Sequence, residues 1–220
     1  MNVAILDPLG PSLSPVALAV LGGVAWLYLR GMGRPRIVGE QVGPVRHGLF
    51  AAGMLLLALA FEGPLAGAGQ SLFLAHQVQH LVIRLLGPLL FILAYPGPVL
   101  RAGLPRPVRR WLGRRKDHPA AQSAARALSR VGTSFVLLVA SLYVWQVPVL
   151  HNAAVAMPPL ALVAHLGMTL AGLNFFAVTL DRRSPPEGAP HGKRLLALVG
   201  VIVSNILLGS LTTMKEMVLY

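Results

Sequence analysis

The residues best suited to chemistry are two histidines inside an apolar stretch. His76 and His80 lie four residues apart in SLFLAHQVQHLVIR, residues 71–84. Residues with this spacing share one face of a helix, so both imidazoles point to the same side. Two neutral imidazole nitrogens directed at one point suit copper, zinc or haem iron. Gln77 stands where the zinc-protease pattern H-E-x-x-H requires a catalytic glutamate, so we expect no enzymatic activity.

The composition is that of a membrane protein. Hydrophobic residues make up 55% of the 220 residues and charged residues only 12%, far from the balance of a soluble domain. The apolar residues form blocks long enough to cross a bilayer at about 20 residues each. We therefore predict an all-α, polytopic membrane protein, a single transmembrane helical domain over residues 1–220. Its bundle of about six helices spans roughly 13–30, 45–62, 70–95, 129–148, 158–180 and 195–214.

Basic residues mark the cytoplasmic side. Apart from Arg84 and Lys215, every lysine and arginine lies in one of three loops, which follow the first, third and fifth spans. The positive-inside rule then puts those loops in the cytoplasm and both termini outside a bacterial plasma (inner) membrane. The net charge of +12 therefore points to contact with the lipid bilayer. We expect no binding to nucleic acid, because the basic residues carry no nucleic-acid motif or interleaved aromatic platform.

Orientation and helix rise place several metal-ligating residues at one depth. Counted from the outer surface, His76 lies about 9 Å deep, His80 about 15 Å and His165 about 10 Å. His151 falls in the outer turn above them, and Met168 follows His165 by three residues. The chain has no cysteine, and a soft thioether favours Cu(I) over harder ions. The predicted site is a copper centre, Cu(I) preferred, with these ligands: His76, His80, His165, His151 and Met168.

Other uses of the same histidines stay open. Haem ligation by His80 and His165 is one alternative, with Arg84 near a propionate, and metal transport is another. Arg84 lies at roughly mid-membrane, so we expect it to avoid lipid, although the sequence shows no partner for it. Whether the chain forms a homodimer is also open. So are the roles of acidic and thioether residues near the predicted outer surface: Glu62, Met214 and Met217.

Three segments carry a family likeness. HQVQHLVIRLLGPLLFILAYPGPVL, which begins at His76, resembles the core of the CtaG-like assembly factors of caa-type cytochrome c oxidases. Two later segments, HNAA from His151 and HLGMTLAGLNFF from His165, resemble that family's outer turn and its later histidine-bearing helix. The chain departs from the family pattern at Gln77, often methionine there, and at Ala164, often an acid. The matching positions of the first segment are His76, Gln79, His80, Pro88 and Pro96.

The resemblance implies a function in oxidase assembly. Proteins of this kind are implicated in maturing the oxidase copper centre, plausibly the copper beside the high-spin haem. By this likeness the chain is a membrane-embedded metallochaperone that receives copper from the external, periplasmic face and delivers it there. The implied partners are a cytochrome c oxidase subunit or another copper chaperone.

Overall fold

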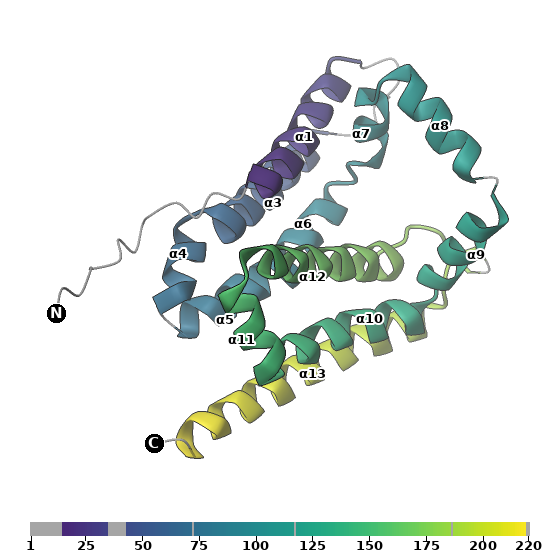
Figure 1. The fold of residues 1–220 in the computed structure, drawn as a ribbon. Helices are drawn as coiled ribbons and strands as arrows, with labels where there is room; N and C mark the ends of the chain where they lie inside the picture. The colour runs from purple at the N-terminus through teal and green to yellow at the C-terminus, as the bar shows by residue number, and fades with distance from the viewer. Residues whose placement is uncertain (1–14, 35–42, 72, 117, 186, 219–220) are drawn as a thin grey trace. The chain divides into compact units, whose positions relative to one another are not determined.

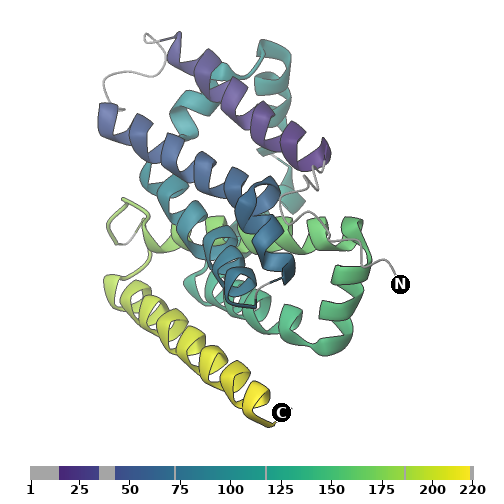
Figure 2. The same ribbon diagram turned by 90° about the vertical axis from the view of Figure 1, so that its left-hand side faces the viewer.

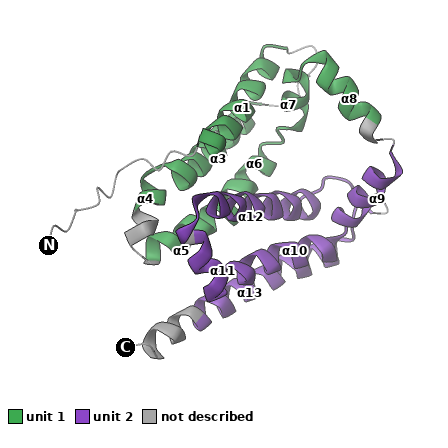
Figure 3. Ribbon diagram, viewed as in Figure 1, with its two compact units in different colours: residues 1–116 green, residues 117–220 purple. Residues whose placement is uncertain are grey.

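The computed structural model describes residues 15–34, 43–71, 73–116, 118–185 and 187–218. These residues form helices joined by turns, with no strand among them (Figure 1). The all-α prediction is therefore confirmed. The chain divides into two compact units, residues 1–116 and 117–220 (Figure 3). The single domain over residues 1–220 stays a prediction, and each unit is described by itself.

Many of the helices begin at a proline, which lacks the backbone N–H that the first helical turn leaves unbonded. Unit 1 contains α1 (Pro15–Met32), α3 (Pro44–Glu62), α4 (Pro64–Ser71), α5 (Phe73–Leu81), a π-helical turn η1 (Val82–Leu86), α6 (Gly87–Leu93), α7 (Gly97–Gly103) and α8 (Arg106–Lys116). Unit 2 contains α9 (Pro119–Leu128), α10 (Val131–Tyr143), a 3₁₀ turn η2 (Val144–Gln146), α11 (Pro148–Ala156), α12 (Pro158–Thr179) and α13 (His191–Val218).

Five helical segments of the described chain are long and apolar enough to cross a membrane: Pro15–Met32, Pro44–Gly67, Leu74–Leu93, Pro158–Thr179 and His191–Leu211. The last belongs to α13, which runs as one continuous helix (Figure 2). The fourth predicted span, near 129–148, is weaker. Val131–Gln146 passes the same test only together with α9, to which it is bent by 73°. The polytopic prediction is confirmed with five spans, or six if the bent pair counts as one.

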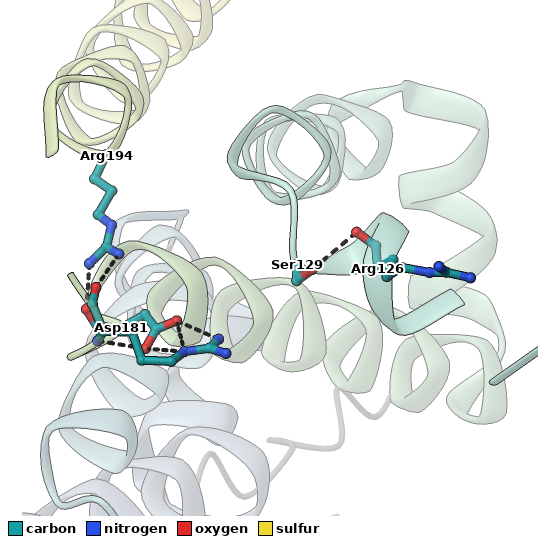
Figure 4. Close-up of polar contacts among 5 residues, drawn as sticks. Arg126, Ser129, Asp181 and Arg194 are labelled. Atoms are coloured by element: carbon teal, nitrogen blue, oxygen red, sulfur yellow. Dashed lines mark hydrogen bonds and ion pairs between the residues drawn. The ribbon is translucent and has the colours of Figure 1, made fainter. Parts of the chain in front are cut away.

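That bend has a local cause in the chain. Ser129 follows the last residue of α9, and its hydroxyl donates a hydrogen bond to the carbonyl of Arg126 at 3.0 Å (Figure 4). A serine hydroxyl that bonds a carbonyl three residues back takes up an acceptor that the ending helix leaves free. The chain then restarts as α10 with Arg130 in an extended conformation. The predicted span therefore begins after a helix end.

Unit 1 is held together by very close approaches between helix backbones. A methyl group added at Gly31 of α1 would overlap the carbonyl oxygen of Val99 in α7. One added at Gly103 of α7 would overlap the carbonyl of Leu27 in α1. Interfaces between membrane helices favour small residues because these let the backbones approach closely. Close packing matters there, since lipid gives no hydrophobic driving force for helices to associate. Beside this crossing, Tyr28 stacks on Phe50 of α3 with ring centroids 3.6 Å apart.

Three basic residues of unit 1, from the end of α1 and the start of α3, lie at one end of it. The Tyr28 hydroxyl and His47 Nδ1 lie 2.8 Å apart, which joins the end of α1 to the start of α3. The Arg46 guanidinium lies over the Tyr95 ring, 5.6 Å from its centroid, just after α6 ends. Arg34 donates to the carbonyl of Ala102 at 2.6 Å. Arg34 and Ala102, which the sequence assigns to two different cytoplasmic loops, thus meet at one end of unit 1, as the positive-inside argument requires.

In unit 2, α10 packs along both α12 and α13. Tyr143 of α10 donates to the carbonyl of Ser204 in α13 at 3.1 Å, so the two helices lie side by side (Figure 1). At the end of α12, the buried guanidinium of Arg194 donates to the backbone carbonyls of Asp181 and Arg183 (Figure 4). The Asp181 carboxylate accepts a hydrogen bond from Arg183, which lowers the pKa of Asp181. Together these contacts fix the turn that leads into α13.

The crossing of α1 and α7 predicts two opposite outcomes for glycines of one helix. Gly31→Ala should lower the free energy of unfolding by about 1–3 kcal/mol, because the new methyl group has no room. Gly23→Ala, where an added methyl group has no neighbour within 4 Å, should be neutral or stabilising by up to about 1 kcal/mol. Thermal unfolding in detergent measures both. Equal midpoints for the two variants would contradict the close crossing.

Candidate metal centre

His76 and His80 lie side by side on α5. Their ring centroids are 4.3 Å apart, with the ring planes tilted by 54°. His80 is buried, with 6% of its surface exposed, and His76 is half-buried. The structure therefore gives the pair the shared face that the spacing predicts. Two histidines four residues apart on one helix face are a pattern known from metal sites, where each imidazole nitrogen binds the ion at about 2 Å.

A buried glutamine fixes α5 against α3. Gln79 is 5% exposed, and its side-chain amide donates to the carbonyl of Ala60 at 2.8 Å. In an uninterrupted helix that carbonyl accepts the N–H of the residue four positions later, but here this residue is Pro64, which has no N–H. Gln79 thus replaces a donor that the proline removes. It is a positioning residue between the two histidines.

The π-helical turn η1 follows the pair directly. The N–H of Gly87 donates to the carbonyl of Val82, five residues back, instead of the usual four. Pro88 explains the wider turn, because in an α-helix its ring would clash with the carbonyl of Arg84. Pro88 is one of the positions that carry the family likeness, but the sequence did not predict the π-helical turn. Such turns occur frequently at functional sites.

Arg84 lies within this turn and is only 4% exposed. The prediction that it avoids lipid is confirmed, because its side chain is enclosed by protein. Arg84 follows His80 by four residues, and the two are buried on the same segment of the third span. The site therefore combines two imidazole rings with a buried guanidinium on one segment. A buried cation nearby favours a ligand set that carries no further positive charge.

Three candidate ligands belong to unit 2. His165 is half-buried on α12, and its backbone carbonyl accepts a hydrogen bond from the Thr169 hydroxyl at 2.9 Å. Met168, one turn further, is 1% exposed. His151 was expected in a turn, and that detail is wrong: it lies in α11, which Pro148 starts as the first helical residue.

The two groups of ligands lie in different units, so their convergence on one ion stays a prediction. Among the described residues, no three histidine or acidic side chains form a ready metal site. In the predicted copper site, the His76–His80 pair supplies two ligands, and at least one further donor is needed. Glu62 ends α3 and is half-buried. The side chains of Met214 and Met217 lie outside the described part of the chain.

The pair lies far from the basic end of unit 1. Gln79 contacts Ala60, and about 21 Å of helix separates Ala60 from Arg46 at the start of α3. The His76–His80 pair and Arg46 therefore lie near opposite ends of α3. This agrees with the predicted depth of the pair near the surface that faces away from the basic loops.

The comparisons decide the family. The chain matches the family model described as cytochrome c oxidase caa3 assembly factor over residues 26–220. The chain belongs to this family. The match extends across both units and includes every candidate ligand, so the resemblance noted in the sequence is confirmed. No curated protein and no solved structure matched the chain.

The role assigned to Gln79 predicts a rescue in this assembly factor. Gln79→Leu leaves the Ala60 carbonyl buried without its donor and should cost about 1–3 kcal/mol of unfolding free energy. Pro64→Ala restores a backbone N–H at the position that normally serves Ala60. The cost of Gln79→Leu should therefore fall sharply in the Pro64→Ala background. Unfolding of the four chains in detergent measures this double-mutant cycle.

Gln77→Leu is the matched control, since it makes the same chemical change two positions away on half-buried Gln77. It should cost less than Gln79→Leu and show no coupling to Pro64→Ala. An equal cost of Gln79→Leu in both backgrounds would mean that the amide does not replace the donor lost at Pro64.

Proposed function

We propose that this protein is a membrane metallochaperone that holds copper and helps to mature the copper centre of cytochrome c oxidase. The observation that carries the proposal is the His76–His80 pair, two rings 4.3 Å apart in a member of an oxidase assembly family. Copper is here the cargo of the protein. The protein supplies ligands, orientation and a dry surrounding, and no chemical step is catalysed.

The ligand set supports copper in its reduced form. His76 and His80 offer two imidazole nitrogens, and His165 of α12 is the proposed third donor. Cu(I) accepts imidazole and soft thioether ligands, and the chain has no thiolate to compete with them. Met168, buried one helical turn from His165, is the proposed thioether donor. His151 of α11 is the proposed first contact for incoming copper, because the positive-inside argument puts the segment before α12 at the outer surface.

A copper carrier must also release its cargo. A site with few neutral ligands can exchange them one at a time with an acceptor, whereas a closed set of thiolates holds the metal more firmly. The Gln79–Ala60 hydrogen bond and the π-helical turn keep the two rings in place before and after the ligand exchange. Thioether side chains such as Met168 are flexible donors, which suits a ligand that must let go.

The direction of delivery follows from the polarity of unit 1. Arg34 and Arg46 lie at one end of α3 and the histidine pair at the other. With the basic end in the cytoplasm, the pair faces the external side of a bacterial inner membrane. The proposed partner there is a cytochrome c oxidase subunit, or another copper chaperone that loads this protein. Transfer proceeds through lateral contact within the bilayer.

Copper analysis tests the proposal directly. The chain purified in detergent and loaded with Cu(I) should retain about one copper ion, and His76→Ala with His80→Ala should abolish retention, because both ring ligands are lost. The control is His118→Ala with His191→Ala, which removes two exposed histidines and should leave binding unchanged. Full copper retention in the His76/His80 variant would refute the proposal. A haem absorption band in the purified protein would favour the haem alternative instead.

The contribution of unit 2 has a separate test. His165→Ala should weaken Cu(I) binding at least about tenfold, or roughly 1.4 kcal/mol, if His165 completes the site of His76 and His80. Competition with a Cu(I) chelator measures the affinity. Thr169→Ala, one turn away, removes only a hydroxyl bonded to the His165 backbone and is the control. Unchanged affinity in His165→Ala would confine the copper site to unit 1.

A further inference from the structure

Over residues 106–114, helix α8 has two chemically distinct faces. Its sequence is RPVRRWLGRRK, with no acidic residue. Val108, Trp111 and Leu112 lie at positions i, i+3 and i+4, so they share one side. All three are exposed, at 40%, 52% and 40% of their surfaces. This group is called the apolar face of α8 below.

The opposite side of α8 is basic. Arg106 and Arg110 are four residues apart and exposed, and they lie across the helix from the apolar face. Arg109 and Arg114 lie between the two faces, at the edges. Long arginine side chains at such edges extend their charged ends toward water while their methylene groups cover apolar surface. A helix with large apolar residues on one side and arginines on the other is typical of a membrane surface.

The fold holds the start of α8 at the basic end of unit 1. α8 begins at Arg106, three residues after α7 ends. The last turn of α7 is fixed to the end of α1, where Arg34 donates to Ala102 and Gly103 packs against Leu27. The chain then continues into α8 (Figure 1). α8 therefore leaves the apolar part of unit 1 where the first predicted span ends, at the level of lipid headgroups.

We propose that α8 is an interfacial helix that binds anionic phospholipid, with its apolar face in the acyl-chain boundary and its arginines on headgroup phosphates. Charge complementarity selects this occupant. Every charged side chain in the described part of α8 is positive, and a bilayer next to the start of α8 offers phosphate groups and apolar chains at matching depths. Trp111 suits this position, because indole combines an apolar ring with a polar N–H. The inference does not depend on copper binding.

The absence of cysteine makes the test direct, because one introduced thiol labels one position. The full chain is prepared as Leu112→Cys, on the apolar face, and as Gly113→Cys, on the basic side. An added side chain at Gly113 meets nothing within 4 Å, so the control site tolerates the probe. Both are labelled with an environment-sensitive dye in lipid nanodiscs. The nanodiscs contain phosphatidylcholine alone or phosphatidylcholine with phosphatidylglycerol.

The expected result has two parts. In nanodiscs with phosphatidylglycerol, the Leu112→Cys probe should emit at shorter wavelength and resist quenching by iodide, while the Gly113→Cys probe is quenched. In phosphatidylcholine alone, protection of the Leu112→Cys probe should decrease. Adding Arg106→Gln, Arg110→Gln and Arg114→Gln should weaken the inserted state about a hundredfold, at roughly fivefold per basic residue. The Leu112→Cys probe should then be quenched as readily as the control.

Two outcomes would overturn the proposal. Equal quenching of both probes with phosphatidylglycerol present would mean that the apolar face lies in water. Equal protection of the Leu112→Cys probe in both lipids and in the arginine variant would mean that protein covers this face, for example an acidic partner. The comparison of lipids uses one labelled chain, so altered folding of a variant does not affect it.

Discussion

The hydrogen bond from Gln79 to Ala60 is the contact on which the candidate site depends. A lipid environment offers no water to a backbone carbonyl, so every carbonyl that loses its helical partner needs another donor. Pro64 removes the donor of Ala60, and Gln79 returns one from a different helix. A proline in α4 thereby sets the position of α5. The polar residue between His76 and His80 is explained by backbone chemistry before any metal is considered.

Pro88 acts on the same segment from the other side. It widens the helix into a π-helical turn at the level of Arg84, directly after the histidine pair. The pair therefore lies between two irregularities caused by proline. At Pro64 the side chain of Gln79 supplies the missing hydrogen-bond donor, and at Pro88 the helix widens into a π-helical turn. Irregular backbone at membrane depth is tolerated where protein encloses it, and Val82, Ile83 and Arg84 of this turn are buried.

The features that the sequence predicted well are those set by local properties. Apolar length gives the spans, the i, i+4 spacing gives the adjacent rings of His76 and His80, and the cost of a charge in lipid gives the burial of Arg84. The π-helical turn and the Gln79 bond depend on which helix lies opposite, so spacing alone did not reveal them. Hydropathy alone did not reveal the bend near Ser129 or the helix around His151. Both depend on short local features, a helix end near Ser129 and a helix start at Pro148.

Unit 1 combines a basic end and a histidine end on the same helices, and the two ends constrain each other. The close crossing of α1 and α7 fixes where α8 begins, and the contacts of α3 fix how far the histidine pair lies from that point. If α8 is anchored in headgroups on one side, it sets the depth of His80 on the other through α3, in which about 21 Å of helix separates Ala60 from Arg46. Depth decides whether a buried imidazole is reached from the external water or only through another membrane protein. In unit 1, the proposed anchoring of α8 and access to the proposed ligands His76 and His80 are consequences of one helical framework.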